Sequence, residues 1–234
     1  MMPRPDVSAL ILEFSNPTPG TSVWSLEPGA WSLEGILAPM EFGEHPATLR
    51  DGTRVIVRPI RPEDREALAA GMERLSDESR YRRFLRPVTS LSERELTYLT
   101  EVDYSNHFAW VAVDPQDSTR GYGVARYVRD PKDPEVAEVA ITVIDDFQGR
   151  GLGSVLMRLI VATALHNGIR TFRGWVLGDN IEVLRPLARI GARRIPDKGV
   201  LRVEVDLGAV YEGSSIHDAI RAVAAGEFTP QPGS

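Results

Sequence analysis

The stretch VIDDFQGRGLGSVLMRLI, residues 143–160, constrains the fold more than any other part of the sequence. It begins at the end of an apolar run, continues through a turn that holds Gly149, Gly151 and Gly153, and ends in apolar residues at helical spacing. The first amides of a helix lack intrahelical partners and carry partial positive charge, and glycine lets the backbone approach a phosphate without an intervening Cβ atom. This pattern predicts a phosphate-binding loop, unless the glycines serve only tight packing of the helix on the strand.

Two common phosphate loops are excluded by the residues present. A Walker A loop needs Gly-Lys followed by Ser or Thr, and no such triplet follows here. A dinucleotide-binding fingerprint needs G-x-G-x-x-G with an acid ~20 residues further on. The spacing here is G-x-G-x-G, and Thr171 and Phe172 stand near the place of that acid.

Apolar periodicity and turn signals predict a mixed α/β domain around the loop. Asp51-Gly52 between two β-like runs predicts a hairpin, and Ser92 with Glu95 forms a capping box at a helix start. Strands are expected in ATLRDGTRVIVRPI (the hairpin), HFAWVAV, GYGVARYV, EVAEVAITVI, TFRGWVL and VLRVEVDL. Helices are expected in RPEDREALAAGMERL, DESRYRRFL, LSERELTYLTEV, residues 151–167 and NIEVLRPLARI. We expect an α/β (α+β) fold whose mixed central sheet of about six or seven strands is flanked by helices.

Composition divides the chain into three parts. Residues 1–45 are expected to form a proline-rich N-terminal extension. Its tryptophans are expected to dock on the main domain or a partner; the alternative is a true start near Met40. Residues 46–212 form the folded domain, and residues 213–234 form a tail with a short helix.

Charge and residue counts exclude several classes of function. A net charge of −6 and a pI of about 5.3 argue against nucleic-acid binding, for which a pI above ~9 is usual. The absence of cysteine excludes disulfides, thiolate metal sites and a cysteine nucleophile, and four scattered histidines give no metal-binding spacing. No apolar run approaches the ~18 residues of a membrane span, and the start lacks a basic signal-peptide region. We expect a cytoplasmic protein that binds neither nucleic acid nor membrane.

The loop Gln148-Gly149-Arg150-Gly151-Leu152-Gly153 resembles the Q/R-x-x-G-x-G/A loop of the GNAT superfamily of N-acetyltransferases. The segment NIEVLRPLARIGA, Asn180 to Ala192, resembles a second marker of that family, and the likeness extends over roughly Leu49 to Leu207. The resemblance implies the GNAT fold and acetyl-CoA as co-substrate, without a metal. It implies that the loop and Ser154 hold the pyrophosphate, that Ile141, Thr142 and Val143 pair with the pantetheine amides through their backbone, and that the Val143 amide polarises the carbonyl.

Two of these residues keep alternative interpretations. Ser154 is either a hydroxyl donor on the phosphate side or simply a residue at the helix start. Asn180 is expected to contact the pantetheine arm or to cap its helix, and both roles are compatible.

The segments LRDGTRVIVRPIRPEDREAL, LSDESRYRRFL and AEVAITVIDDFQGRGLG are similar to the acetyltransferase domain of bacterial protein lysine acetyltransferases. This narrower likeness makes a protein lysine the first candidate for the acceptor amine. A small-molecule amine acetyltransferase and a non-catalytic acyl-CoA sensor are the alternatives, and a homodimer is a further arrangement that the sequence leaves open.

Glu138 is the candidate general base. A lysine amine, with an unperturbed pKa of ~10.4, must lose a proton before it attacks a thioester. Glu138 stands among apolar residues of a strand, on the face of Ala140 and Thr142, where burial is expected to raise its pKa. The resemblance places the catalytic glutamate of the lysine acetyltransferases here. The alternative is a surface glutamate or one that is salt-bridged to Arg126; without cysteine, direct attack in a ternary complex is favoured.

Other polar positions carry weaker expectations. Glu135 and Asp103 are secondary candidates for the base, and His107 is expected to be a packed or exposed histidine. Leu187 occupies the place where many relatives of the family carry a tyrosine that protonates the leaving thiolate, and no replacement acid is evident. The remaining basic residues of interest lie in SRYRRFLRP, where a solvated helix face is expected, or a surface that docks an acidic protein: Arg80, Arg82, Arg83 and Arg86.

Overall fold

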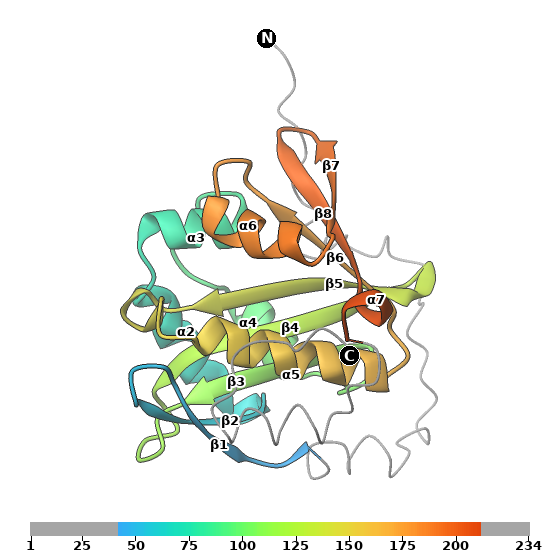
Figure 1. Cartoon of the computed structure of the whole chain (residues 1–234). Coiled ribbons are helices and arrows are strands. Elements are labelled where there is room, and N and C mark those ends of the chain that lie inside the picture. Colours follow the sequence, from blue (N-terminus) through green and yellow to red (C-terminus); the bar gives the residue numbers. More distant parts are fainter. Residues whose placement is uncertain (1–41, 212–234) are drawn as a thin grey trace, which may run out of the picture.

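The computed structural model describes residues 42–211 of the chain (Figure 1). The expectations for residues 1–41 and for the tail from residue 212 onward lie outside the described residues. The strands are β1 (His45–Thr48), β2 (Arg54–Pro59), β3 (His107–Val113), β4 (Gly121–Asp130), β5 (Asp133–Val143), β6 (Thr171–Val176), β7 (Arg193–Asp197) and β8 (Val200–Asp206). The helices are α2 (Arg65–Glu73), α3 (Asp77–Phe84), α4 (Glu93–Thr100), α5 (Leu152–His166), α6 (Ile181–Arg189) and α7 (Leu207–Tyr211), with 3₁₀ turns η2 (Pro62–Asp64) and η3 (Asp145–Phe147).

The strands form one mixed sheet in the order β1-β2-β3-β4-β5-β6-β8-β7. Every neighbouring pair is antiparallel except β5 and β6, which are parallel and are joined through α5. The mixed α/β fold is therefore confirmed, but the sheet has eight strands instead of six or seven. The additional strand is β7, whose sequence RRIPD lacks apolar alternation and contains a proline, which is tolerated because the strand lies at the sheet edge.

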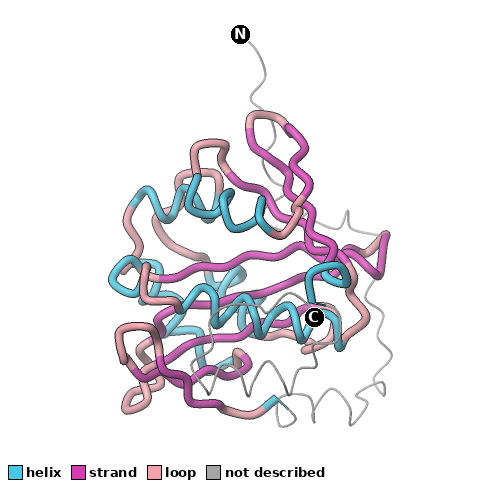
Figure 2. The backbone as a smooth tube through the Cα atoms, viewed as in Figure 1, coloured by secondary structure: helices cyan, strands magenta, loops and turns pink. Residues whose placement is uncertain are grey.

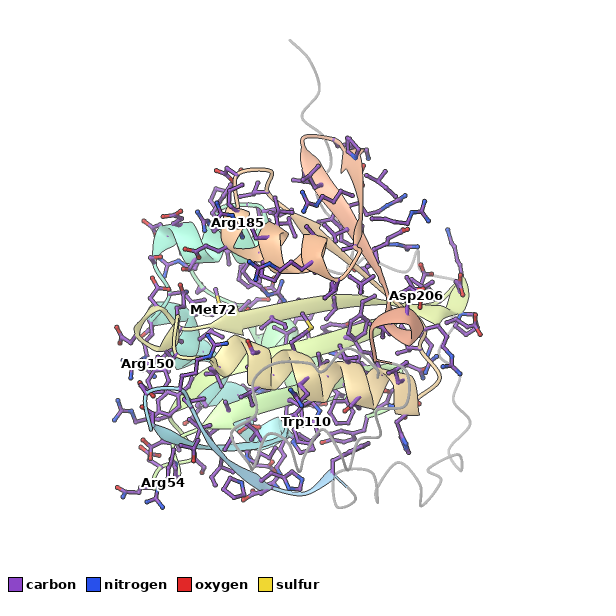
Figure 3. All side chains as sticks on the ribbon, in the orientation of Figure 1. Arg54, Met72, Trp110, Arg150, Arg185 and Asp206 are labelled. Atoms are coloured by element: carbon purple, nitrogen blue, oxygen red, sulfur yellow. The ribbon has the colours of Figure 1, made fainter. Side chains whose placement is uncertain are left out.

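Helix α5 covers one face of the sheet (Figure 2). Its apolar residues pack on the side chains that β3 and β4 direct to that face, including Phe108, Trp110 and Tyr127. Trp110 lies beneath the helix (Figure 3), and its Nε1 donates to Thr163 Oγ1 of α5 at 2.9 Å. On the opposite face, Ile60, Val111 and Val113 belong to a second apolar cluster, towards which α2 and α4 pack. Both faces of the sheet thus carry apolar packing, and the larger cluster also includes Met72 of α2 and Phe84 of α3.

The sheet opens between β5 and β6. The two strands pair only through Val136–Thr171, Ala137–Phe172 and Glu138–Arg173, although β5 continues to Val143 and β6 to Val176. Figure 1 shows the two strands diverging after this short contact. The β6 side of β5 beyond Val139 therefore faces no strand among the described residues, and the opening widens towards the glycine loop.

Candidate active site

The glycine loop connects η3 to the first turn of α5. Gly149 and Gly151 have φ values of +73° and +93°, which favour glycine because other residues rarely adopt them. The amides of Ser154 and Val155 donate to the Gly151 carbonyl at 3.1 and 3.2 Å. The preceding amides, those of Leu152 and Gly153, have no intrahelical acceptor by the geometry of a helix start. The local structure thus presents free N–H groups and the positive end of the α5 dipole to an anion.

The β1–β2 turn holds the loop from outside. The Arg50 amide donates to the Arg150 carbonyl at 3.0 Å, and the Arg150 guanidinium pairs with Asp51 at 3.1 Å and lies 4.8 Å from the centre of the Phe147 ring. Figure 3 shows Arg150 at this corner of the molecule. The stem of Arg50 packs directly on Gly151, where a Cβ atom would lie 3.1 Å from Arg50 Cγ. Two arginines therefore flank the loop, both held by local contacts.

Gln148 braces the loop from the side of β5. Its Nε2 donates to the Val143 carbonyl at 3.1 Å, to Asp145 Oδ1 at 3.2 Å and to Ser79 Oγ of α3 at 3.3 Å. These bonds fix the direction in which the chain leaves β5. The Gln148 side chain therefore positions the glycine loop.

The open edge of β5 lies between the loop and Glu138. Ile141 and Val143 pack their side chains on the α5 core, while Thr142 points to the opposite face. Backbone groups alternate along a strand, and the Ile144 amide donates to the Tyr122 carbonyl at the end of this pairing. The backbone groups of Thr142 therefore face β4, and those of Ile141 and Val143 face the opening towards β6. Ser154 is half-buried on the first turn of α5, on the far side of the loop.

Asn180 stands at the start of α6, where its backbone carbonyl accepts from Leu184 N at 3.0 Å. Its side chain makes no capping hydrogen bond, so the expected capping role is not found. Its Oδ1 is buried without a hydrogen-bond partner among the described residues. An unsatisfied buried oxygen costs about 1–3 kcal/mol, and a ligand N–H removes that cost. This orphaned acceptor, the free edge of β5 and the loop amides together fit an extended amide-bearing ligand that ends in a diphosphate.

Glu138 lies where the pairing of β5 and β6 ends, opposite Val128 on β4 and Arg173 on β6. The strand register confirms that it shares a face with Ala140 and Thr142. Burial raises the pKa of Glu138 to about 7; the nearby Arg173 opposes the rise and Asp130 adds to it. Arg173 is itself paired with Asp130 at 3.0 Å and with Glu204 at 3.3 Å.

The alternative that pairs Glu138 with Arg126 is wrong. The Nη1 atom of Arg126 donates to the Leu99 carbonyl at 3.0 Å and contacts His107 Nε2 at 3.0 Å. Arg126 lies opposite Ala140, two residue pairs further along β5. Within residues 42–211, Glu138 forms no ion pair and remains available to a substrate.

His107 is a packed histidine, as expected. Its ring is buried and lies 4.9 Å from the ring of Tyr98. Burial and the Arg126 charge lower the pKa of His107 to about 3, so the imidazole is neutral near pH 7 and a poor proton acceptor. Burial also raises the pKa of Tyr98, with a further contribution from Glu138. The proximity of Tyr98 to Glu138 was not predicted, because nothing in the pattern of α4 points to a partner on β5.

The other carboxylates considered do not compete with Glu138. Asp103 accepts from the amides of Ser105, Asn106 and His107 at 2.7–3.0 Å and therefore shapes the loop before β3. Glu135 is exposed at the start of β5. Leu187 packs against the core from α6, so that position supplies no acid.

The described part of the chain contains no group of three or more His, Asp or Glu side chains that could hold a metal ion. None of the described helices combines the length and apolarity needed to cross a bilayer.

Comparisons with known proteins agree with this geometry. A family model described as "Acetyltransferase (GNAT) domain" matches residues 54–193. The chain is 39% identical over 168 residues to acetyltransferase Pat of Mycolicibacterium smegmatis, a match that covers 70% of this chain and 49% of that protein. It therefore spans about half the length of that relative.

Solved structures give the same result. The GNAT domain of S. lividans PAT superposes with a TM-score of 0.65 at 33% identity, covering 72% of this chain and 98% of that one. A cAMP-binding acyltransferase from Mycobacterium smegmatis superposes with a TM-score of 0.53 at 31% identity, and the match covers 87% of this chain and 63% of that chain.

Proposed function

The chain belongs to the GNAT family of acetyltransferases, and from that premise we propose that it transfers an acetyl group from acetyl-CoA to a lysine side chain of another protein. Support for the acceptor comes from the similarity to acetyltransferase Pat and to the GNAT domain of S. lividans PAT. The likeness of residues 49–68, 75–85 and 137–153 to bacterial protein lysine acetyltransferases points the same way.

The residues of the loop and of the open β5 edge are suited to acetyl-CoA, which supplies an activated thioester carbonyl when bound. The amides of Leu152 and Gly153, with the Ser154 hydroxyl, would bind the diphosphate. The backbone of Ile141 and Val143 would pair with the pantetheine amides, while Thr142 between them pairs with β4. The buried Oδ1 of Asn180 would accept a further N–H from the same arm.

Glu138 is the proposed general base. An ordinary glutamate, with its pKa of 4.5, would be a weak acceptor for a proton from an ammonium group of pKa ~10.4. A pKa of about 7 makes Glu138 a stronger base and still leaves it substantially ionised at neutral pH. The freed amine then attacks the thioester carbonyl directly, since the chain has no cysteine to carry the acyl group. A C–N bond forms, the C–S bond breaks, and coenzyme A leaves as a thiolate. The Val143 amide donates to the carbonyl oxygen as negative charge develops there.

The observation that carries the proposal is the half-buried Glu138, with its raised pKa, at the point where the sheet opens towards the loop. The test combines two measurements on the full-length protein. Incubation with acetyl-CoA and a lysine-bearing protein mixture, read by mass spectrometry, should show acetylated lysines that are lost with Glu138→Gln. The same variant should retain its affinity for acetyl-CoA.

Other outcomes would assign the site differently. Transfer to free amines alone would indicate a small-molecule acetyltransferase. Acetyl-CoA binding with no transfer to any amine would indicate a sensor. Full activity of Glu138→Gln would show that Glu138 is not the base.

A further inference from the structure

An apolar pocket of about 70 Å³ lies on the Glu138 face of the sheet, beneath α2, α3 and α4. Its wall is mostly aliphatic and includes Leu68, Met72, Leu99, Val111, Val113 and Val124. Two arginines complete the wall, Arg83 from α3 and Arg126 from β4. Because Arg126 lies opposite Ala140, the pocket begins two residue pairs along the strand from Glu138.

Neither arginine is neutralised by a carboxylate among the described residues. Arg126 is only 5% exposed, and its hydrogen-bond partners, the Leu99 carbonyl and His107, are both uncharged. The Nη1 of Arg83 is buried without an acceptor, and its guanidinium lies 4.9 Å from the centre of the Phe84 ring.

The one carboxylate in the pocket wall is already fully used. Asp64 accepts from both terminal nitrogens of Arg58, at 2.7 and 2.6 Å, and from the Arg61 amide at 2.8 Å. It therefore offers no spare charge to Arg83 or Arg126. The pocket holds two guanidinium groups with an excess of positive charge.

This arrangement is costly in the free protein. Burial lowers the pKa of Arg83 to about 10, and burial together with the Arg83 charge lowers that of Arg126 to about 9. Both groups remain charged at neutral pH, so the pocket retains two like charges in an apolar surrounding. A bound anion would relieve both the missing hydrogen bond and the repulsion.

We propose that the pocket binds a small aliphatic carboxylate, whose oxygens accept from Arg83 and Arg126 and whose hydrocarbon stem contacts the aliphatic wall. The planar guanidinium matches a carboxylate well. A phosphate dianion would lose more hydration and leave the apolar wall without a partner. A water needs roughly 10–15 Å³ of such space, so the volume suits a ligand of a few heavy atoms.

Two sources supply this chemistry. One is a free short-chain acid such as butyrate. The other is the side chain of a glutamate near the target lysine of the acceptor, since that side chain is a propionate on a peptide. The second source rests on the proposed function, whereas the first does not.

The binding test uses thermal melting of the full-length protein in sodium butyrate, with sodium chloride of equal ionic strength and butanol as controls. With a Kd near ~1 mM, ~20 mM butyrate would nearly saturate the pocket and raise the Tm. The shift should disappear in Arg83→Met and in Arg126→Met. It should persist in Arg82→Met, a matched control on the same helix, because Arg82 pairs with Glu78 at 2.6 Å outside the pocket.

A second readout does not depend on any ligand. Without butyrate, Arg83→Met should melt at or above the wild-type temperature, because it removes a charged group whose Nη1 atom is buried without an acceptor. A structural arginine would instead destabilise the protein when replaced. The proposal is overturned if butyrate leaves the wild-type Tm unchanged, if the shift survives both pocket variants, or if Arg83→Met melts well below wild type.

Peptide kinetics separate the two sources. If the acceptor supplies the carboxylate, a peptide with glutamate near its lysine should have a kcat/KM about tenfold above its glutamine counterpart, and butyrate should raise its KM. If the source is a free acid, butyrate should bind without changing the KM. Failure of transfer alone would remove the proposed function and leave the binding test intact.

Discussion

Replacing Gly151 by alanine tests whether the loop geometry, and not merely its presence, holds the diphosphate. Gly151 has φ +93°, a conformation that costs an L-residue about 1–2 kcal/mol. An added Cβ would also lie 3.1 Å from Arg50 Cγ and 3.3 Å from both Cδ and Nε. The Arg50 stem is flexible and can move, so the clash should shift that side chain more than it destabilises the fold.

Gly149→Ala is the matched control, because Gly149 has φ +73° but an added Cβ would meet nothing within 4 Å. Both variants should lose about 1–2 kcal/mol of unfolding free energy from the backbone term, which corresponds to a Tm decrease of roughly 2–8 °C for a protein of this size. Only Gly151→Ala should also displace Arg50 from the side of the loop.

The assay is isothermal titration with acetyl-CoA at low salt, together with melting curves of both variants. We expect the Kd of Gly151→Ala to rise by about tenfold or more, equivalent to ~1.4 kcal/mol, and that of Gly149→Ala to change by less. Equal affinities of the two variants would refute the reasoning, because the contact of Arg50 with Gly151 would then have no part in binding.

Further predictions concern the residues around the opening. The kcat/KM should fall as pH drops below about 7, where Glu138 becomes protonated, and Glu138→Gln should lower it by about 10²–10⁴-fold and abolish that limb of the profile. In the folded protein the pKa of Glu138 is raised from 4.5 to about 7, so its protonated form stabilises the fold at low pH and this stabilisation is lost as pH rises through 7. Glu138→Gln, which stays neutral, should therefore melt at a higher temperature than wild type at pH 8 and at the same temperature at pH 4. Asn180→Ala should weaken acetyl-CoA binding in titration without lowering the Tm, because the Asn180 side chain makes no cap bond. Ser92→Ala, which removes a side chain that caps α4, should lower the free energy of unfolding by about 1 kcal/mol. A large Tm loss in Asn180→Ala would contradict the absence of a cap bond. Asp64→Ala should cost about 3–5 kcal/mol in urea unfolding, since it leaves the buried Arg58 with only the longer contact to Glu44 at 3.7 Å. A cost below about 1 kcal/mol would mean that water or Glu44 compensates Arg58.

Periodicity was sufficient for most elements of the fold because they obey local rules. The short apolar runs of β3 and β4, the capping box of α4 and the helical spacing after Gly151 each follow from neighbouring residues. Strand β7 was missed because it is held by its pairing with β8 and not by an apolar face of its own.

The opening of the sheet could not be predicted in the same way. The sequence of β5 is continuous to Val143, and nothing in it marks Glu138 as the last residue paired to β6. Where two parallel strands stop pairing depends on how each is held by its other neighbour, β4 on one side and β8 on the other. The sequence therefore predicted a buried glutamate, but the structure was needed to show that it stands at the mouth of an opening.

Helix α3 shows which signal was present and overlooked. The expectation of a solvated basic face holds for Arg82, which pairs with Glu78 four residues earlier. Arg80 contacts Asp77 three residues earlier, but it is largely covered and donates to the carbonyls of Met72 and Leu75. Four and three residues before Arg83 stand Ser79 and Arg80, so no acid at helical spacing on α3 neutralises Arg83. Arg83 also directly precedes the buried Phe84, and without an acid to hold it at the surface its side chain can turn towards the interior. In this protein Arg83 brings an unpaired charge into the layer of the sheet that also carries Glu138.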